Sequence, residues 1–191
     1  MGPDPKLGPS QCLRHNGEMS APSSPPVAIR PATSDDLDQV IEVLWEVAAE
    51  GLWLGVQVPF DRQARRSAMA ALVDGVAGML FVADASDSRD GGPEIVGDIS
   101  VGLMKYGVAD IGMLLAQGWR GKGIGTALLA AGLDWAAASG AHKAALEVWP
   151  HNEAGLALYR KAGFVEEGRK RRHYRRANGE IWDAILMGRP L

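Results

Sequence analysis

The sequence predicts a single α/β (α+β) domain in which a mixed central sheet of about seven strands is flanked by helices. Three observations predict it. The chain has 191 residues, 47% hydrophobic and 23% charged, which is the size and composition of one globular domain. After a first strand and two helices, three consecutive strands with short connections indicate an antiparallel meander. From Gln117 onward, a glycine-rich loop is followed by alternating helices and strands, which makes the sheet a mixed one.

Residues 1–26 are predicted to be a disordered extension, and the domain is expected over residues 27–191. The extension holds six of the 11 prolines, and none of the 6 Trp, 3 Tyr and 3 Phe residues. Such a segment buries too little apolar surface to offset the entropy lost on ordering it. Met19 is an alternative start of translation.

The first elements of the domain follow from hydrophobic spacing. Residues 27–30 alternate as a short strand, and residues 33–36 offer N-cap candidates for a helix. Apolar residues between 37 and 47 recur at three- and four-residue spacing, so they form one buried stripe on that helix. Residues 51–62 are irregular and lead into a second helix over about 62–72.

Strands are expected next, at residues 79–83, 95–103 and 108–115, separated by a polar turn over 84–93 and a tight connection at 105–107. A helix over 126–139 ends at Gly140, because glycine is the residue favoured just past a helix. The later elements are a strand over 144–149, a helix over 153–162 capped by Asn152 and ended by Gly163, a strand from Phe164, a turn at 178–179 and a strand over 181–187.

Composition excludes several classes of protein. Twenty Lys and Arg against 23 Asp and Glu give a net charge of -3, so neither nucleic acid nor a membrane surface is expected as a partner. Cys12 is the sole cysteine, which excludes an internal disulfide, and the four scattered histidines suggest no metal site. No apolar stretch reaches the roughly 18 residues of a membrane span, and no secretory signal is seen, so a cytoplasmic location is expected.

The segment from Gln117 to Thr126 carries the strongest functional signal. Its glycines alternate at positions 121, 123 and 125, between a strand and a helix. Backbone N–H groups at the positive end of a helix suit a pyrophosphate, and glycines let the phosphate oxygens approach closely. Arg120 and Lys122 add charge. The spacing fits neither a P-loop nor the dinucleotide-binding fingerprint, and a plain strand-to-helix turn is the alternative.

A second segment, from Asn152 to Phe164, places Asn152 at a helix start and Tyr159 two turns later. Together the two segments resemble the GNAT superfamily of acyl-CoA-dependent N-acyltransferases. Arg120, Gly123 and Gly125 match the family's Q/R-x-x-G-x-G/A signature, and the Leu-Tyr and Gly-Phe pairs of the second segment match its later motif. The resemblance covers residues 29–191 and implies a sheet that splays between its fourth and fifth strands, with Gly112 marking a strand irregularity there.

The resemblance also implies acetyl-CoA as co-substrate. Its pantetheine arm would lie along the strand end at 113–115, its pyrophosphate in the loop over 120–126, and its sulfur near Tyr159, which would donate a proton to the leaving thiol. Asn152 would contact the pantetheine. The implied cofactor-binding residues are Met113, Leu114, Leu115, Arg120, Gly121, Lys122, Gly123, Ile124, Gly125, Thr126, Asn152 and Tyr159.

The attacking amine must lose a proton, and a carboxylate is the usual acceptor. Asp110 and Glu147 are the candidate bases, and either is alternatively a solvated or ion-paired carboxylate. Asp183 on the last strand is a candidate for orienting the substrate. The predicted reaction is therefore direct transfer of an acetyl group to a primary amine, with Tyr159, Asp110 and Glu147 as catalytic residues.

The acceptor amine is left open between a small molecule and a protein, and homodimers are common among similar proteins. Trp45, Trp53 and Phe60 are candidates for an apolar acceptor site, with core packing favoured for Trp45. Residues 169–176 hold six of the 20 basic residues. This segment is interpreted mainly as a solvated hairpin, and its charge mildly favours an acidic acceptor. A competing interpretation is a non-catalytic acyl-CoA-binding module associated with RNA or the ribosome.

Overall fold

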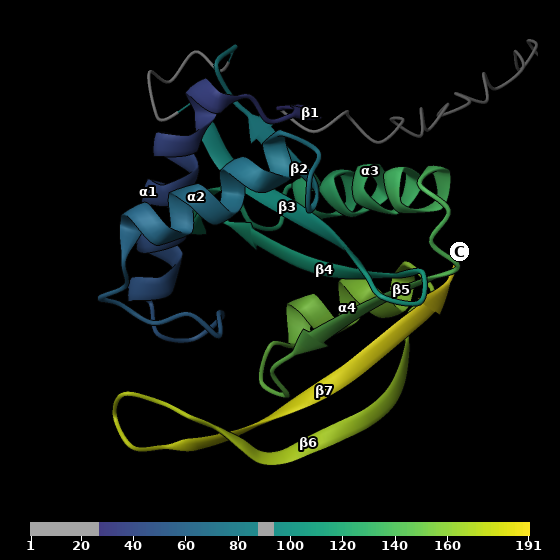
Figure 1. Cartoon of the computed structure of the whole chain (residues 1–191). Helices are drawn as coiled ribbons and strands as arrows, with labels where there is room; N and C mark the ends of the chain where they lie inside the picture. Colours follow the sequence, from purple (N-terminus) through teal and green to yellow (C-terminus); the bar gives the residue numbers. More distant parts are fainter. Residues whose placement is uncertain (1–26, 88–93) are drawn as a thin grey trace, which may run out of the picture.

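The computed structural model describes residues 27–87 and 94–191. The predicted disordered extension over residues 1–26 and the second half of the predicted turn, residues 88–93, lie outside this range. Within it, the chain forms the mixed sheet and flanking helices that the sequence predicts (Figure 1).

The sheet has seven strands in the order β1-β2-β3-β4-β5-β7-β6. Strands β1 to β4 form an antiparallel meander, β4 and β5 are parallel, and β5, β7 and β6 are again antiparallel. The expected strand pattern is therefore confirmed. The strands are β1 Ala28–Pro31, β2 Gly78–Asp84, β3 Ile95–Met104, β4 Val108–Leu115, β5 Lys143–Val148, β6 Val165–Arg175 and β7 Ile181–Pro190.

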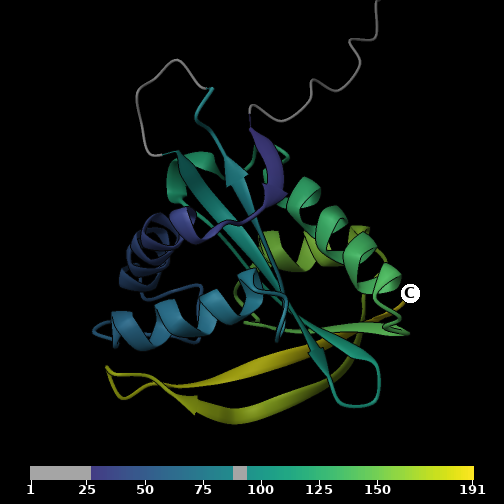
Figure 2. The same ribbon diagram turned by 45° about the horizontal axis from the view of Figure 1, so that its top comes forward.

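Helices cover both faces of the sheet. Figures 1 and 2 show α1 and α2 on one side, and α3 and α4 on the other. The α-helices are α1 Leu37–Ala49, α2 Arg62–Val73, α3 Ile124–Ala138 and α4 Glu153–Lys161, and two 3-10 helices span Ser34–Asp36 and Gln117–Trp119. The predicted stripe on α1 is buried, because its apolar side chains pack on β2 and β4.

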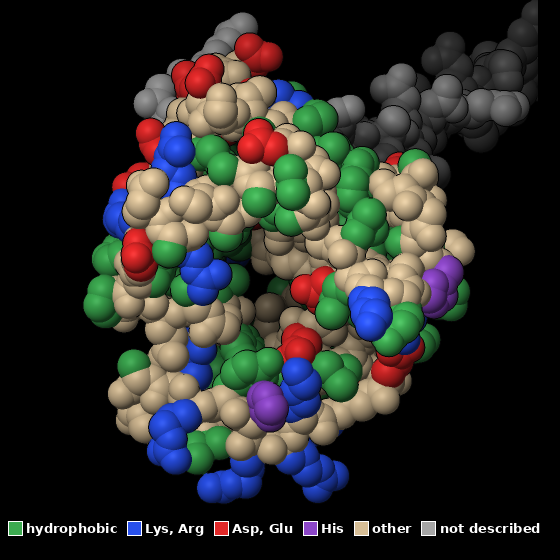
Figure 3. Space-filling view, in the orientation of Figure 1, with side chains coloured by type: hydrophobic (Ala, Val, Ile, Leu, Met, Phe, Trp, Pro, Cys, Tyr) green, Lys and Arg blue, Asp and Glu red, His purple; other side chains and the backbone are tan. Residues whose placement is uncertain are grey.

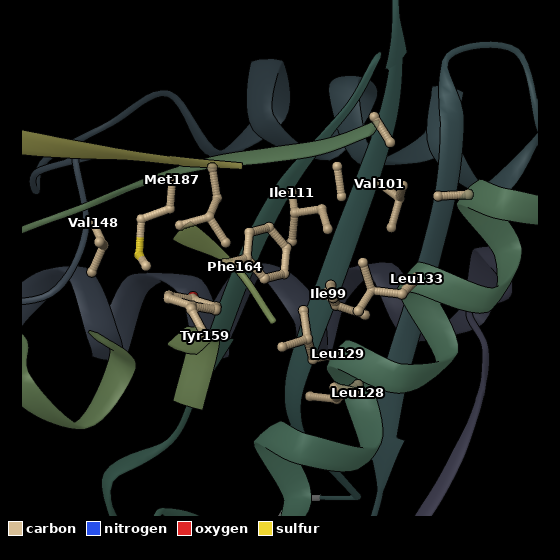
Figure 4. Packing of buried hydrophobic residues seen from close by; sticks show 14 of the residues in the cluster. Ile99, Val101, Ile111, Leu128, Leu129, Leu133, Val148, Tyr159, Phe164 and Met187 are labelled. Atoms are coloured by element: carbon tan, nitrogen blue, oxygen red, sulfur yellow. The ribbon is translucent and has the colours of Figure 1, made fainter. Parts of the chain in front are cut away.

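The largest hydrophobic cluster lies between the sheet and the helices α3 and α4. Ile99 and Val101 of β3 meet Leu128 and Leu133 of α3, as Figure 4 shows. In the same view, Tyr159 of α4 lies within this cluster, together with Phe164, which precedes β6. The cluster therefore fixes α4, and with it the one tyrosine that the sequence marks as functional, against the sheet.

Strands β4 and β5 are paired over three residues only, from Val108 to Asp110 in β4. Beyond Asp110 the two strands separate, so the predicted splay is present (Figure 1). The prediction that Gly112 marks an irregularity is wrong, because the β3–β4 register runs unbroken through Gly112 and its partner Ser100. A Cβ atom at Gly112 would lie 2.9 Å from the Ser100 Oγ, so the glycine is explained by a close side-chain neighbour.

Helix α3 starts two residues earlier than the sequence predicts. Gly123 adopts a φ of 82° as the N-cap, a left-handed conformation that other residues adopt at a cost, and the helix begins directly after it. The glycine-rich loop therefore ends at Gly123, and Gly125 belongs to the first turn of the helix.

Candidate functional site

A cavity of about 350 Å³ opens where β4 has lost its neighbour β5. It is bounded by the end of β4, the glycine-rich loop, the first turn of α3, and α4. Of the predicted cofactor-binding residues, those that line this first cavity are Met113, Leu114, Leu115, Arg120, Gly121, Gly123, Gly125, Thr126, Asn152 and Tyr159.

Two predicted residues, Lys122 and Ile124, do not line the first cavity. Ile124 points into the core and is fully buried, and the Lys122 ammonium lies 4.8 Å from the centroid of the Trp119 ring. The main chain of Lys122 still belongs to the loop, and that of Ile124 begins α3. A continuous run of loop residues in the sequence does not distinguish inward-facing from outward-facing side chains, so it includes both.

The loop presents main-chain donors without protein acceptors. Among the described residues, no hydrogen bond from the N–H groups of residues 121–125 is recorded, whereas Thr126 and Ala127 donate to the Gly123 carbonyl. A Cβ atom added at Gly121 or Gly123 would meet nothing within 4 Å. Free N–H groups at the positive end of a 15-residue helix, beside open space, form an arrangement suited to an anion.

Arg120 lines the first cavity, but its guanidinium is already paired. Its Nη atoms donate to the two carboxylate oxygens of Glu50, at 2.8 and 2.5 Å, and its Nε donates to the Leu115 carbonyl at 2.9 Å. The hydrogen bonds from Arg120 hold the pKa of Glu50 below its usual range. Arg120 therefore ties the glycine-rich loop to the end of α1, a contact across 70 residues for which the sequence has no local signal.

Asn152 caps α4, as predicted, by accepting a hydrogen bond from the Gly155 N–H at 2.9 Å. Tyr159 follows two turns later and is 9% exposed. Burial raises the pKa of Tyr159 to about 12, so the phenol keeps its proton at neutral pH. Tyr159 and Asn152 line both the first cavity and a second one beside it.

The second cavity, of about 300 Å³, lies between the separating strands β4 and β5. Figure 3 shows this hollowed face of the molecule, with acidic side chains beside the hollow and basic ones gathered below it, over β6 and β7. Trp53, Leu54 and Met113 border both cavities, so the two spaces adjoin along one wall. The remaining lining residues are Gly55, Asp110, Ile111, Gly112, Glu147, Val148, Trp149 and Tyr174.

The two predicted bases, Asp110 and Glu147, meet in the second cavity. Loss of surrounding water and, secondarily, the Glu147 carboxylate raise the pKa of Asp110. Loss of water also raises the pKa of Glu147, but hydrogen bonds from Lys170 and Tyr174 outweigh it and leave that pKa lowered. The Tyr174 hydroxyl donates to Glu147 Oε2 at 2.5 Å, and the Lys170 ammonium donates to Oε1. The two carboxylates therefore differ, one engaged by partners and one without a recorded partner among the described residues.

Aromatic side chains from three elements border the second cavity: Trp53 after α1, Trp149 after β5 and Tyr174 on β6. Trp149 and Tyr174 meet edge to face, with ring centroids 5.0 Å apart. Of the three aromatic candidates for an acceptor site, Trp53 lines this cavity, whereas Trp45 and Phe60 pack on each other with ring centroids 5.1 Å apart. Trp149 and Tyr174 were missed, because only the pairing of β5, β7 and β6 brings them together.

The tip of the β6–β7 hairpin is fastened to the loop after α1. The Arg176 guanidinium donates to the carbonyls of Gly55 at 3.2 Å and Gly51 at 3.4 Å, and the Ala177 N–H donates to the Gln57 side chain at 2.7 Å. Arg176 is 5% exposed and lies 4.5 Å from the centroid of the Trp182 ring. These contacts hold the aromatic wall of the second cavity in place.

Asp183, the candidate for orienting a substrate, lies outside both cavities. Its neighbours in the strand, Trp182 and Ala184, pair with Tyr174 and Lys170 on the Glu147 side of the sheet, so Asp183 faces the other way. There it accepts hydrogen bonds from Arg169 Nε at 2.8 Å and from the Arg172 N–H at 2.7 Å.

Neither a metal centre nor a membrane helix is found in the described ranges. No group of three or more His, Cys, Asp or Glu side chains there is placed to hold a metal ion. No helix of residues 27–87 and 94–191 is long and apolar enough to cross a membrane.

Comparisons with known proteins show the family and the fold. A family model described as the acetyltransferase (GNAT) family matches residues 60–164, more than half of the chain. N-alpha-acetyltransferase RimI from Mycobacterium tuberculosis is 40% identical over 78 residues, which are 41% of this chain and 46% of that protein. The match therefore spans less than half of this relative.

Solved structures share the fold. A GNAT-family acetyltransferase from Streptococcus pneumoniae superposes with a TM-score of 0.75 at 22% identity, covering 86% of this chain and 99% of that one. A ribosomal-protein-alanine N-acetyltransferase from Brucella melitensis gives 0.75 at 24%, with the same two coverages. A phosphinothricin acetyltransferase from Sinorhizobium meliloti, in complex with AcCoA, gives 0.74 at 21%, covering 86% and 88%.

Proposed function

The chain belongs to the acetyltransferase (GNAT) family, and on that premise we propose that it transfers an acetyl group from acetyl-CoA directly to a primary amine. One observation carries the proposal. The donor-rich first cavity and the acidic second cavity adjoin, and Tyr159 borders both. Two substrates bound in these cavities would meet beside a protonated phenol.

The first cavity suits the cofactor at both of its ends. The N–H groups of residues 121–125 and the positive end of α3 would bind the pyrophosphate. The edge of β4 beyond Asp110, which no longer pairs with β5, would accept the pantetheine arm as an added strand, with Asn152 opposite it. The glycine-rich loop, and not the paired Arg120 guanidinium, would supply most of the contacts to phosphate.

The chemistry is assigned to the residues between the cavities. An ammonium group, once deprotonated to the amine, attacks the thioester carbonyl; the new C–N bond forms, the C–S bond breaks, the nitrogen loses a second proton, and the thiolate takes one. Tyr159 would give that proton, since its raised pKa keeps the phenol protonated at neutral pH, and the proton lost by the nitrogen would restore the phenol. A main-chain N–H on the free edge of β4 would stabilise the oxyanion.

Asp110 is the better candidate for the base. Its pKa is raised, and no hydrogen bond to its carboxylate is recorded among the described residues. Glu147 is occupied by Lys170 and Tyr174, and its lowered pKa makes it a weaker proton acceptor. We assign proton removal to Asp110, and to Glu147 an electrostatic role beside it.

The test measures thiol release from acetyl-CoA across a panel of amines, together with cofactor affinity by titration calorimetry. Tyr159→Phe should lower kcat by about 100-fold or more and change acetyl-CoA affinity little. Tyr106→Phe is the matched control, because Tyr106 is 80% exposed in the turn between β3 and β4. Tight cofactor binding without turnover of any amine would favour the non-catalytic module instead.

A further inference from the structure

The charge of the second cavity is one-sided. Among the described residues that line it, Asp110 and Glu147 are carboxylates, and none is Lys, Arg or His. In such a space a positive group is attracted and a negative group is repelled, and surrounding apolar side chains strengthen both effects. Ile111 and Met113 provide such surroundings here. The charge of the cavity therefore favours positively charged ligands over negatively charged ones, whatever their shape.

The side chain of Lys170 indicates which kind of positive group the second cavity accommodates. Its ammonium donates a hydrogen bond to Glu147 and lies 5.9 Å from the centroid of the Tyr174 ring. The side chain is 32% exposed and reaches the carboxylate from β6 across β7. A primary alkylammonium thus already sits at the rim of the cavity against a carboxylate and an aromatic face, which is the contact that an acceptor would make with the unpaired Asp110.

The walls suit an apolar carbon skeleton behind that ammonium. Trp53, Trp149 and Tyr174 give three aromatic faces from separate elements, and Leu54 adds an aliphatic one. Trp149 is further packed against Trp182, with ring centroids 5.5 Å apart, so its indole is held from behind. A rigid aromatic wall binds a flat or apolar group at a small entropic cost.

Within residues 27–87 and 94–191, two basic side chains that contact the lining of this cavity, Lys170 and Arg176, already have partners. The guanidinium of Arg176 approaches the Trp149 ring to 5.6 Å, but it does not line either cavity and is bonded to the carbonyls of Gly51 and Gly55. Using it to bind a substrate would release the hairpin from the loop that carries Trp53. This differs from the expectation, drawn from the basic run of β6, that an acidic acceptor is favoured.

We propose that the second cavity selects a primary ammonium carried on an aromatic or other apolar skeleton and rejects amines whose α-carbon bears a carboxylate. The inference rests on the proposed acetyl transfer and narrows its acceptor. Free arylalkylamines and the α-amino group of an amino-acid amide or peptide share this chemistry. Free amino acids do not, because their carboxylate would lie within the field of Asp110 and Glu147.

The test uses acceptors that differ in the carboxylate alone. Tryptamine is compared with tryptophan, and phenylalaninamide with phenylalanine, by the rate of thiol release from acetyl-CoA. We expect kcat/KM to be about 100-fold higher for the member of each pair that lacks the carboxylate. Butylamine, which lacks the ring, should fall below tryptamine by about tenfold or more. Comparing kcat/KM for tryptamine with kcat/KM for phenylalaninamide then shows whether a free arylalkylamine or an amino-acid amide is the better acceptor.

A variant tests the cause of the selection. Asp110→Asn should reduce the ratio of kcat/KM for tryptamine to kcat/KM for tryptophan at least severalfold. Loss of a base slows the reaction of both amines alike, so a change in this ratio reports on the charge of Asp110. Asp183→Asn removes a carboxylate from the opposite face of the same sheet and should leave the ratio unchanged.

The outcomes separate this inference from the proposed function. Equal or better use of tryptophan overturns the inference, leaves acetyl transfer standing, and points to Arg176 as a carboxylate anchor. An Asp110→Asn ratio equal to that of the wild type also overturns it. Absence of turnover with every acceptor, amino acids included, overturns both the inference and the proposed function.

Discussion

The carboxyl group of Asp98 is buried in the sheet, and replacing the residue by asparagine tests how much this burial lowers the stability of the fold. It is 3% exposed, and its Oδ2 atom has no hydrogen-bond partner in the part of the chain that the structure describes. In the ladder it lies between Val82 and Leu114, whose side chains pack on α1. Burial without a compensating partner raises the pKa of Asp98 from 3.8 to about 7.

The magnitude follows from proton linkage. Between pH 3.8 and about 7 the native chain keeps a proton that the unfolded chain releases, so stability falls by about 1.4 kcal/mol for each pH unit. Between pH 5 and pH 8 the loss is about 3 kcal/mol, all of it incurred by pH 7. Asparagine resembles the protonated acid and does not titrate. The stability advantage of Asp98→Asn over the wild type should therefore grow by about 3 kcal/mol between pH 5 and pH 8.

The assay is urea unfolding at both pH values, followed by tryptophan fluorescence, with Asp134→Asn as a control for loss of one exposed charge. The quantity compared is the difference in unfolding free energy between variant and wild type. If that difference is the same at pH 5 and pH 8, Asp98 does not hold its proton in the native state, and the reasoning is refuted.

Three further predictions concern the loop, the sheet and the base. Gly97→Ala should lower the unfolding free energy by about 1–3 kcal/mol, because its Cβ would lie 2.6 Å from a main-chain oxygen of β4. Gly102→Ala is the control: its Cβ would have its nearest neighbour at 3.9 Å, so urea unfolding should show less than half of that loss in unfolding free energy. Gly123→Ala and Gly140→Ala, at φ values of 82° and 83°, should each lose about 1–2 kcal/mol, but titration calorimetry should find at least tenfold weaker acetyl-CoA binding only for Gly123→Ala, whose methyl group enters the cradle. Asp110→Asn should lower kcat by about 100-fold in thiol-release assays, and wild-type kcat should fall as pH drops through the raised pKa of this carboxyl.

Each of these predictions has a contradicting result. Equal unfolding free energies for Gly97→Ala and Gly102→Ala would mean that β4 moves away from the new methyl group without loss of stability. Equal acetyl-CoA affinity of the two helix-terminus variants would place the phosphate elsewhere. A fully active Asp110→Asn enzyme would transfer the role of base to Glu147 or to solvent.

Local patterns predicted most of the fold. Period-two and three-to-four spacing located the strands and helices, and Asn152 and Gly163 marked the ends of α4, because each of these signals acts within a few residues. The start of α3 was misplaced by two residues, since a run of glycines does not indicate which one takes the left-handed conformation.

The site was predicted in its main-chain part and less well in its side chains. Loop glycines and the end of β4 line the first cavity because their spacing fixes the backbone. Glu50, Trp149 and Tyr174 were missed, because their roles depend on contacts across 23 to 70 residues or across strands. Asp183 was misjudged for the same reason, as its face follows from the β6–β7 register.

Glu50 connects the walls of the two cavities. Its carboxylate receives the Arg120 guanidinium of the glycine-rich loop and, at 2.5 Å, the indole N–H of Trp53, which borders both cavities. If acetyl-CoA and an amine bind there as proposed, a shift of the loop upon nucleotide binding would reach the wall that faces the amine. The two association equilibria would then be thermodynamically linked, and each ligand would change the affinity of the other by the same factor.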